Sequence, residues 1–453
     1  MNIRIRKHMA TLAAAFIALA VLASSCSSND YVNAIPASAT ALMKFKISSM
    51  DDTSAAQDLL NMIGVENVRQ SGIDLSNDVY AFETVDGNLG LCAKVGDMDK
   101  ITDMLGKMAD KGKATRPSGS GDIMLADING SWCVGYNKSG ILMVGPVSAT
   151  LMADTKRTIM KLLKQDSERS VVTRPAFAKI DTMTASISLV AQVQALPEKL
   201  AAPLTIGAPK DADPSQIWFA ADIANVGGNL IIRGTPFSFD ATVDKGLRDV
   251  NSNYRKIGTK YIPYLDRANA FAVMLNVDGT KFLPMLQSSK ALQALLVGMN
   301  TAIDFDNVIR SVNGDMLIAS AGFSGTLSLN MRADISRNPA WVKDVEYWRQ
   351  SCPAGATITA NGDNAWVYSS GATKLYFGIH DGAQFYCTTK MPEPIGTSCG
   401  SLIDADAAME IGQSRFALVV NPSAFTGGML SDSGANHFAT ALGKLKTIIY
   451  VMK

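Results

Sequence analysis

The hydrophobic residues of the chain follow two spacings, which predict short strands and single amphipathic helices. Strand-like segments at 79–95 and 123–136 are each divided by a turn dipeptide, Asp86-Gly87 and Asn129-Gly130. Glycine accepts the positive φ that tight hairpin turns require, so both segments are predicted hairpins. Between them, apolar residues at the spacing of one helix face are Ile101, Met104, Leu105 and Met108. Hairpins interleaved with single helices predict an α+β fold, with antiparallel or mixed sheets and helices packed on one face.

The same order of segments occurs twice. Ile35-Pro36 leads into a strand-like segment at 39–47, and Ile262-Pro263 leads into another at 268–275. The hairpin at 79–95 has a counterpart at 316–331, which turns at Ser324-Gly325. We therefore predict two tandem copies of one α+β unit, at 34–255 and 256–453.

The second copy also repeats the helix and the paired strands after it. Asn338 is predicted to cap a helix whose first turn holds Pro339. Its apolar face would carry Trp341, Val342, Val345 and Trp348. The segment 358–368 then corresponds to 123–136, which gives Trp132 and Trp366 equivalent positions.

The two copies differ at their ends. A strand at 217–221 corresponds to one at 448–451, but only the first copy turns at Gly227-Gly228 and returns through 230–239. The second stops at Lys453. Two alternatives stay open: the last strand forms a sheet edge, which proteins usually protect, or the chain is shorter than its ancestor.

The first 25 residues have the pattern of a secretory signal peptide. Basic residues precede an apolar run at 10–22, and the small residues Ala23-Ser24-Ser25 precede Cys26. Because the run is too short to cross about 30 Å of hydrocarbon, it predicts cleavage and lipid attachment at Cys26 rather than a transmembrane helix. Each buried methylene of an acyl chain contributes about 0.8 kcal/mol, so we expect Cys26 to hold the protein to a membrane. Residues 26–33 are polar and are predicted to form a tether.

Composition narrows the classes of function. The chain has 42 basic and 41 acidic residues, and cleavage before Cys26 removes three basic ones, so the mature protein is slightly acidic. We therefore expect no nucleic-acid partner. The mature chain keeps two histidines, His380 and His437, and has no C-x-x-C pair. We expect no metal site and no cofactor.

Five cysteines remain once Cys26 is lipidated, and an odd number leaves at least one unpaired. They are Cys92, Cys133, Cys352, Cys387 and Cys399. Export permits disulfides, so a bridge between Cys92 and Cys133 is one interpretation. Burial of both as small apolar residues is the other.

One segment matches a catalytic pattern. Gly396-Thr397-Ser398-Cys399-Gly400 fits G-x-S-x-G, and Asp404, Asp406 or Asp432 followed by His437 would complete a triad in chain order. The preceding segment 390–395 contains two prolines, which a buried strand would not accept. We expect no catalytic residues, and keep a serine hydrolase using Ser398 as the alternative.

Three other patterns have simple structural interpretations. His380-Asp381 precedes Gly382 and predicts an exposed hairpin turn rather than an acid/base pair. The segment 106–113 differs from a phosphate loop in spacing and predicts a helix end at Gly112. The acidic pairs lack the remainder of a calcium loop and predict helix caps and turns: Asp97 with Asp99, Asp211 with Asp213, and Asp304 with Asp306.

Aromatic residues could line a glycan or peptide cleft, because flat rings bind such ligands at low entropic cost. The candidates are Trp218, Trp341, Trp348, Tyr368 and Tyr376. Core packing is the competing interpretation for residues at strand and helix spacing.

The segment ending in Cys26, the opening at 31–40 and the duplicated hairpin-helix units together resemble a family of uncharacterised lipoproteins of Bacteroides-type bacteria. That family is catalogued as domain of unknown function 4836. The resemblance implies an outer-membrane lipoprotein, with the periplasmic face and the cell surface both open, since Asp30 alone supplies acidity after Cys26. We expect a lipid-anchored, non-enzymatic binding or scaffold ectodomain with a protein or glycan partner. A purely structural envelope protein is a further alternative.

Overall fold

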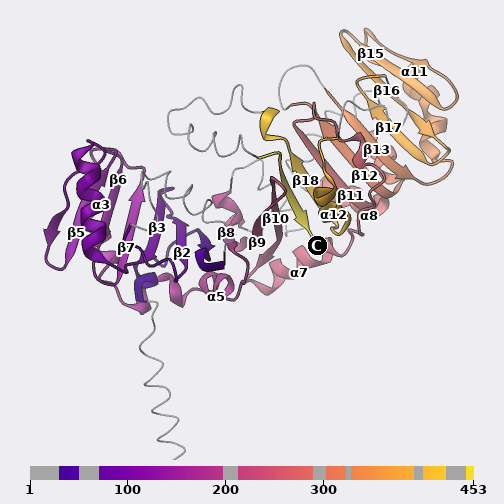
Figure 1. Cartoon of the computed structure of the whole chain (residues 1–453). Coiled ribbons are helices and arrows are strands. Elements are labelled where there is room, and N and C mark those ends of the chain that lie inside the picture. The colour runs from indigo at the N-terminus through magenta and orange to yellow at the C-terminus, as the bar shows by residue number, and fades with distance from the viewer. Residues whose placement is uncertain are drawn as a thin grey trace, which may run out of the picture. The chain divides into compact units, whose positions relative to one another are not determined.

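The computed structural model describes residues 30–49, 71–196, 213–288, 303–322, 328–391, 401–424 and 445–453 (Figure 1). These residues form two compact units. Unit 1 contains the described residues of 1–39 and 63–178, and unit 2 contains those of 40–62 and 179–453. In this described part, no helix is both long and apolar enough to span a membrane.

Unit 1 is built on an antiparallel sheet. Its strands are β2 (Val79–Glu83), β3 (Leu89–Lys94), β4 (Ser118–Ser120), β5 (Ile123–Ile128), β6 (Trp132–Tyr136) and β7 (Gly140–Gly145). They pair in the order β2-β3-β7-β6-β5-β4. Both predicted hairpins of this unit are confirmed: Gly87 has φ 75°, and Asn129-Gly130 has φ 51° and 66°.

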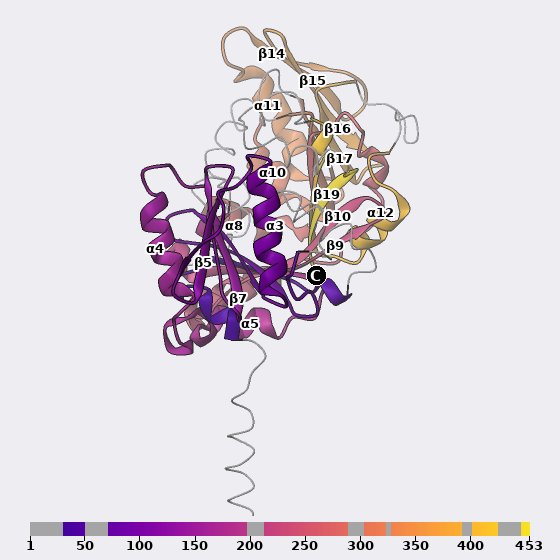
Figure 2. The ribbon, with the colours of Figure 1, turned by 60° about the vertical axis from the view of Figure 1, so that its left-hand side comes forward.

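The helices of unit 1 run alongside these strands (Figure 2). They are α3 (Met98–Asp110) and α4 (Met152–Leu162), and α5 (Pro175–Asp181) follows at the boundary between the units. The predicted apolar face of α3 is confirmed, because Ile101, Leu105 and Met108 are buried.

The fold begins ahead of residue 34. A 3-10 helix at Asp30–Ala34 buries Tyr31 and Val32, and the Tyr31 hydroxyl donates to the Asp78 carbonyl at 2.6 Å. These two apolar side chains lie in a stretch that is otherwise polar, and the predicted tether at 26–33 therefore includes residues that pack against the first unit.

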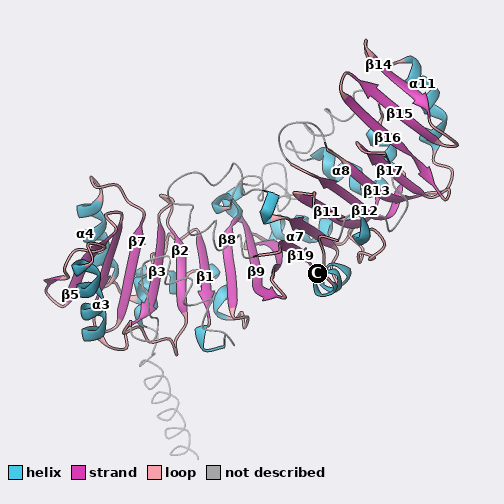
Figure 3. Ribbon diagram, turned by 45° about the horizontal axis from the view of Figure 1, so that its top comes forward, coloured by secondary structure: helices cyan, strands magenta, loops and turns pink. Residues whose placement is uncertain are grey.

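Unit 2 contains a longer, mixed sheet (Figure 3). Its strands are β1 (Ala41–Phe45), β8 (Ile187–Gln192), β9 (Ile217–Val226), β10 (Asn229–Ser238), β11 (Phe271–Asp278), β12 (Val312–Ser320), β13 (Asn330–Ile335), β14 (Ala356–Ala360), β15 (Ala365–Ser370), β16 (Thr373–His380), β17 (Gln384–Thr388), β18 (Phe416–Val420) and β19 (Thr447–Met452). They pair in the order β1-β8-β9-β10-β19-β18-β11-β12-β13-β17-β16-β15-β14. The α+β prediction is confirmed.

The pair β10–β19 is parallel, whereas the other pairs in this order are antiparallel. Its register runs from Asn229 opposite Thr447 to Arg233 opposite Val451. The strand β19 also pairs with β18, so both of its sides are hydrogen-bonded. This answers the question that the sequence left open: the last strand is not a sheet edge, because β10 covers it.

The helices of unit 2 are α7 (Ala241–Asn251), α8 (Gly279–Ser288), α10 (Phe305–Arg310), α11 (Val345–Gln350) and α12 (Ala405–Gly412). They do not lie on one face, so that prediction is wrong for this unit. On β19, Ile449 and Val451 pack into a core that includes α12, whereas Met452 packs into a core with α8, α10 and α11. The strands β18 and β19 are apolar at almost every position, which is typical of strands buried on both faces.

The predicted helix after Asn338 is also different. Asn338 has φ 53° and does not cap a helix; Pro339 precedes a 3-10 turn at Ala340–Asp344, and α11 begins only at Val345. A tight turn suits Asn338 because asparagine tolerates the left-handed region. The predicted apolar residues Trp341, Val345 and Trp348 are nevertheless buried.

We expect Trp341 to be essential to the core of β12, β13 and β17. Its side chain is 1% exposed, stacks on Trp348 at 5.9 Å between centroids and donates from Nε1 to Ser311 Oγ at 3.2 Å. Trp341→Ala should lower the free energy of unfolding by about 3–5 kcal/mol, measured by urea denaturation. Tyr347→Ala, at a side chain that is 69% exposed, is the control and should change it by about 0.5 kcal/mol or less. Equal effects would contradict this packing.

Candidate functional site

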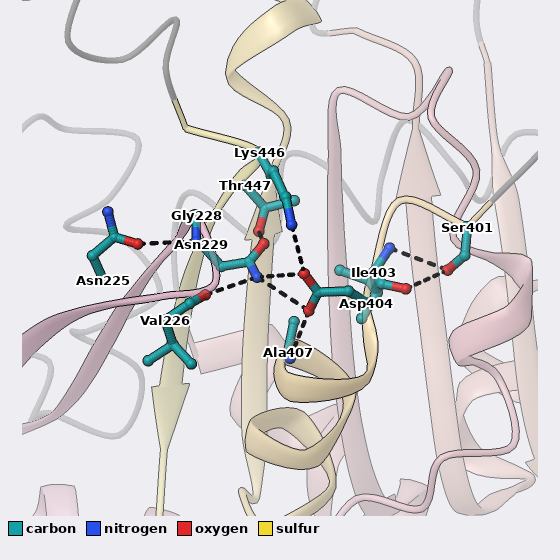
Figure 4. A network of polar contacts seen from close by, with 10 residues as sticks. All are labelled: Asn225, Val226, Gly228, Asn229, Ser401, Ile403, Asp404, Ala407, Lys446 and Thr447. Carbon is teal, nitrogen blue, oxygen red and sulfur yellow. Dashed lines mark hydrogen bonds and ion pairs between the residues drawn. The ribbon is translucent and has the colours of Figure 1, made fainter.

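A network of polar side chains lies where β10 and β19 begin (Figure 4). The amide of Asn229 donates from Nδ2 to both carboxylate oxygens of Asp404, at 3.1 and 2.9 Å. Its Oδ1 accepts from Thr447 Oγ1 at 2.7 Å. Asn229 and Thr447 face each other in the parallel pair and are 1% and 0% exposed. One buried amide therefore connects β10, β19 and the segment before α12.

Asp404 is the other centre of the network. It caps α12 by accepting from the Ala407 N–H at 3.0 Å, and Lys446 Nζ lies 3.3 Å from its Oδ2. Partial burial acts to raise the pKa of Asp404, but the hydrogen bonds from Ala407, Asn229 and Lys446 together outweigh burial and lower it. Each oxygen of this carboxylate accepts two hydrogen bonds, so Asp404 holds together β10, Lys446 and the start of α12.

Local sequence explains how the network is placed. Gly227-Gly228 has φ 60° and 89°, the conformation that a two-residue turn between β9 and β10 requires. The Gly228 N–H donates to Asn225 Oδ1 at 3.0 Å, and the Gly228 carbonyl accepts from the Lys446 N–H at 2.8 Å. This turn therefore delivers Asn229 beside Thr447 at the start of both strands.

A second contact fixes the same strand to α12. Arg233 donates from Nε and Nη2 to the two oxygens of Glu410, at 2.9 and 2.5 Å. These hydrogen bonds lower the pKa of Glu410 and raise that of Arg233. Because α12 is held at Asp404 and again at Glu410, the helix is fixed at both ends of its contact with β10.

Comparison with known proteins gives a family. The family model described as Domain of unknown function (DUF4836) matches residues 12–393. The chain belongs to this family. No curated protein matches the chain.

Two solved structures of a protein called TP0453 are similar to parts of the chain. Crystal form IV is 11% identical and covers 43% of this chain and 75% of that one, with a TM-score of 0.26. Crystal form III is 9% identical; the match covers 80% of this chain and 92% of that one, with a TM-score of 0.23. Likeness at this level gives this DUF4836 member no functional assignment.

Several predicted residues lie outside the described residues: the lipidation candidate Cys26, the hydrolase candidate Ser398 with Cys399, and Asp432 and His437. Asp404, one of the acids proposed to complete that triad, is used by the network. His380 Nε2 lies 3.3 Å from Asp381 Oδ2, and the two side chains are 63% and 67% exposed. Asp381 has φ 49°. The exposed hairpin turn predicted there is confirmed.

The predicted caps are confirmed where the structure describes them. Asp97, Asp213 and Asp304 each accept a backbone N–H at the start of a helix. Gly112, at φ 70°, follows the end of α3 and donates to the Ala109 carbonyl at 3.0 Å. Among the described residues, no three His, Cys, Asp or Glu side chains come together as a metal site would require.

The cysteines of the described part are free thiols: Cys92, Cys133, Cys352 and Cys387. Cys92 and Cys133 are buried, so the bridge between them is wrong and the interpretation as small apolar residues is confirmed. Burial raises the pKa of Cys133 to about 11, with a further contribution from the nearby Asp127 carboxylate. Cys92, Cys133 and Cys387 belong to the hydrophobic core.

The aromatic candidates do not form one cleft. Trp341 and Trp348 belong to the core, with Tyr368 packed against it. Trp218 contacts the exposed Phe239, at 5.5 Å between ring centroids, on the other part of the sheet. Sequence spacing alone could not separate these residues, since aromatic side chains favour strands and helices whether or not they face solvent.

We expect Asp404→Ala to lower the free energy of unfolding by more than the loss of a helix cap alone would. The cap itself contributes about 1 kcal/mol. Asn229 Nδ2 keeps its hydrogen bond to the Val226 carbonyl at 3.0 Å, but its second N–H loses its acceptor, and a buried unpaired donor costs about a further 1–3 kcal/mol. Asp240→Ala is the matched control, since Asp240 caps α7 by accepting from Thr242 and Val243. Urea denaturation should show the larger loss for Asp404→Ala, and equal losses would show that the network adds nothing to the cap.

We expect the Arg233–Glu410 pair to weaken in acid. The pKa of Glu410 is lowered in the folded state by the hydrogen bonds from Arg233. The stabilisation by the pair is therefore complete above the pKa of Glu in the unfolded chain, about 4.3, and is lost as the pH falls below that value. Glu410→Gln should cost about 1.5–3 kcal/mol at neutral pH. The difference from wild type should shrink between about pH 5 and pH 3.

Glu346→Gln is the control for this titration, because Glu346 and Arg349 form an exposed pair with side chains 57% and 54% exposed. Exposed pairs contribute about 0–1 kcal/mol. Denaturation curves collected across the pH range measure both variants, and a Glu410→Gln difference that stays constant down to pH 3 would contradict the assignment.

Proposed function

We propose that the chain is a lipoprotein, anchored to the outer membrane through Cys26, whose ectodomain is a non-enzymatic binding scaffold made of two tandem copies. The observation that carries the proposal is a repeated strand order. Unit 1 pairs as β2-β3-β7-β6-β5-β4, and part of unit 2 pairs as β12-β13-β17-β16-β15-β14. Read in these orders, β2 corresponds to β12, β3 to β13, and so on to β4 and β14.

The remaining strands support the same division. The order β1-β8-β9 is matched by β11-β18-β19, with the same antiparallel pairing. The strand β10 has no counterpart and closes the second copy by pairing with β19. In this order β6 corresponds to β16 and β5 to β15, so Trp132 in β6 and Trp366 in β15 are not equivalent. The sequence match between 123–136 and 358–368 is therefore shifted by one strand.

The polar groups at the centre of unit 2 favour a scaffold over an enzyme. Asp404, Asn229, Arg233 and Glu410 are engaged with one another or with backbone groups, which gives them a role in holding strands together. The signal-like segment that ends at Cys26 supports membrane attachment. A purely structural envelope protein would share these features, and ligand binding by the ectodomain separates the two.

The anchor is tested by Cys26→Ala. In a bacterium that processes lipoproteins, wild type should sediment with membranes and need detergent for release, because acyl chains bury many methylene groups. Cys26→Ala should lose that association, measured as the soluble fraction after lysis and centrifugation. Cys352→Ala, which removes a partly exposed thiol elsewhere, is the control and should remain with the membranes. A Cys26→Ala protein that is still released only by detergent would overturn the anchor.

A further inference from the structure

Arg332 lies in the middle of β13, and its guanidinium is close to two tyrosine rings. It pairs with Leu317 on β12 and with Tyr386 on β17. Its Cζ is 4.1 Å from the ring centroid of Tyr264 and 5.9 Å from that of Tyr386. A guanidinium over tyrosine rings is held by cation–π attraction, which fixes its plane without using its N–H donors.

Among the described residues, the guanidinium of Arg332 makes one hydrogen bond. Nε donates to Asn330 Oδ1 at 3.4 Å, and within the described residues no carboxylate lies within 4.0 Å of the guanidinium. The nearby Asp334 already binds Lys260 Nζ at 2.5 Å and the Tyr261 hydroxyl at 2.8 Å. Arg233, by contrast, is neutralised by Glu410 on both oxygens. Arg332 is therefore a half-buried cation without a described counter-charge.

Burial lowers the pKa of Arg332, as expected for a cation that has lost water and gained no anion. An arginine in this situation gains most from a ligand that supplies two acceptor atoms in one plane. A carboxylate does so, because its two oxygens match the fork of the guanidinium.

The neighbouring strand β16 has a glycine beside Tyr386. Gly378 pairs with Tyr386, and a Cβ at this position would lie 2.8 Å from the Tyr386 hydroxyl and 2.5 Å from the Asn364 carbonyl oxygen. Glycine therefore lets Tyr386 lie across β16. Tyr376 is two residues from Gly378 on the same strand face and is half-buried, so tyrosines extend from Arg332 across β17 and β16.

We propose that Arg332, framed by Tyr264 and Tyr386, is a binding site for an acidic sugar, a hexuronate or a chain containing one. The guanidinium binds the carboxylate, and the tyrosine rings and hydroxyls contact the apolar and hydroxyl-bearing faces of the sugar ring. The site deepens the proposed binding scaffold and does not involve Cys26, so failure of the sugar site leaves the anchor test unaffected.

The test is calorimetric titration of the full chain in detergent with sodium glucuronate. Glucose, which lacks the carboxylate, and sodium acetate, which lacks the ring, are the comparison ligands. Wild type should bind glucuronate saturably and more tightly than either. Arg332→Met should weaken glucuronate binding about 10- to 100-fold, the loss expected for a hydrogen-bonded charge. Arg332→Lys should weaken it less, because it keeps the charge and loses the fork.

Arg337→Met is the matched control, since Arg337 is exposed just beyond β13 and should be dispensable. Thermal unfolding of each variant within a few degrees of wild type shows that it is folded. Three results would overturn the proposal: no glucuronate binding by folded wild type, equal binding of glucose, or unchanged affinity in Arg332→Met. A large loss of stability in Arg332→Met without glucuronate binding by wild type would show that the guanidinium is satisfied within the chain.

Discussion

The backbone of β19 must find hydrogen-bonding partners on both sides, and the parallel contact with β10 provides one of them. Buried N–H and C=O groups left unpaired are costly, so a strand this apolar needs a neighbour at each edge. The side chains around it serve that pairing. Asn229 and Thr447 set the register at its first residues, and Arg233 connects β10 to the helix that covers β19. The centre of unit 2 is therefore determined by one strand pair.

Much of the fold follows from local sequence. Turn dipeptides located the hairpins at Gly87 and Asn129-Gly130, and apolar spacing located α3 and its buried face. These features depend on residues close together in the chain. The number of sheet faces that helices cover does not depend on nearby residues alone. The strands β18 and β19 are apolar on both faces, but a short apolar segment in a sequence does not show whether one face or both are buried. Asn338 was misassigned because asparagine suits both a helix cap and a left-handed turn.

The candidate site was less accessible to sequence reasoning. Asn229 and Asp404 are 175 residues apart, and an isolated Asn after two glycines is most simply a turn residue. Arg332 gave no sequence signal, since its significance lies in the rings beside it and in the absence of an acid within reach in the described part of the chain. Asp404 entered the sequence analysis only as a possible triad acid. Its place just before α12 is typical of a helix cap, but caps are common and indicate nothing about β10.

The pairing of β10 with β19 also has a consequence in time. Asn229 and Thr447 are 218 residues apart, so one side of β10 stays unpaired until the residues of β19 become available. A chain that folds from its N-terminus as it is made therefore carries an open strand edge from the completion of β10 at Ser238 until β19 is made. Such edges invite pairing with other chains, and contacts between distant residues form slowly. Closure of this strand pair therefore competes with aggregation while the protein folds, and chaperones that shield strand edges would favour closure.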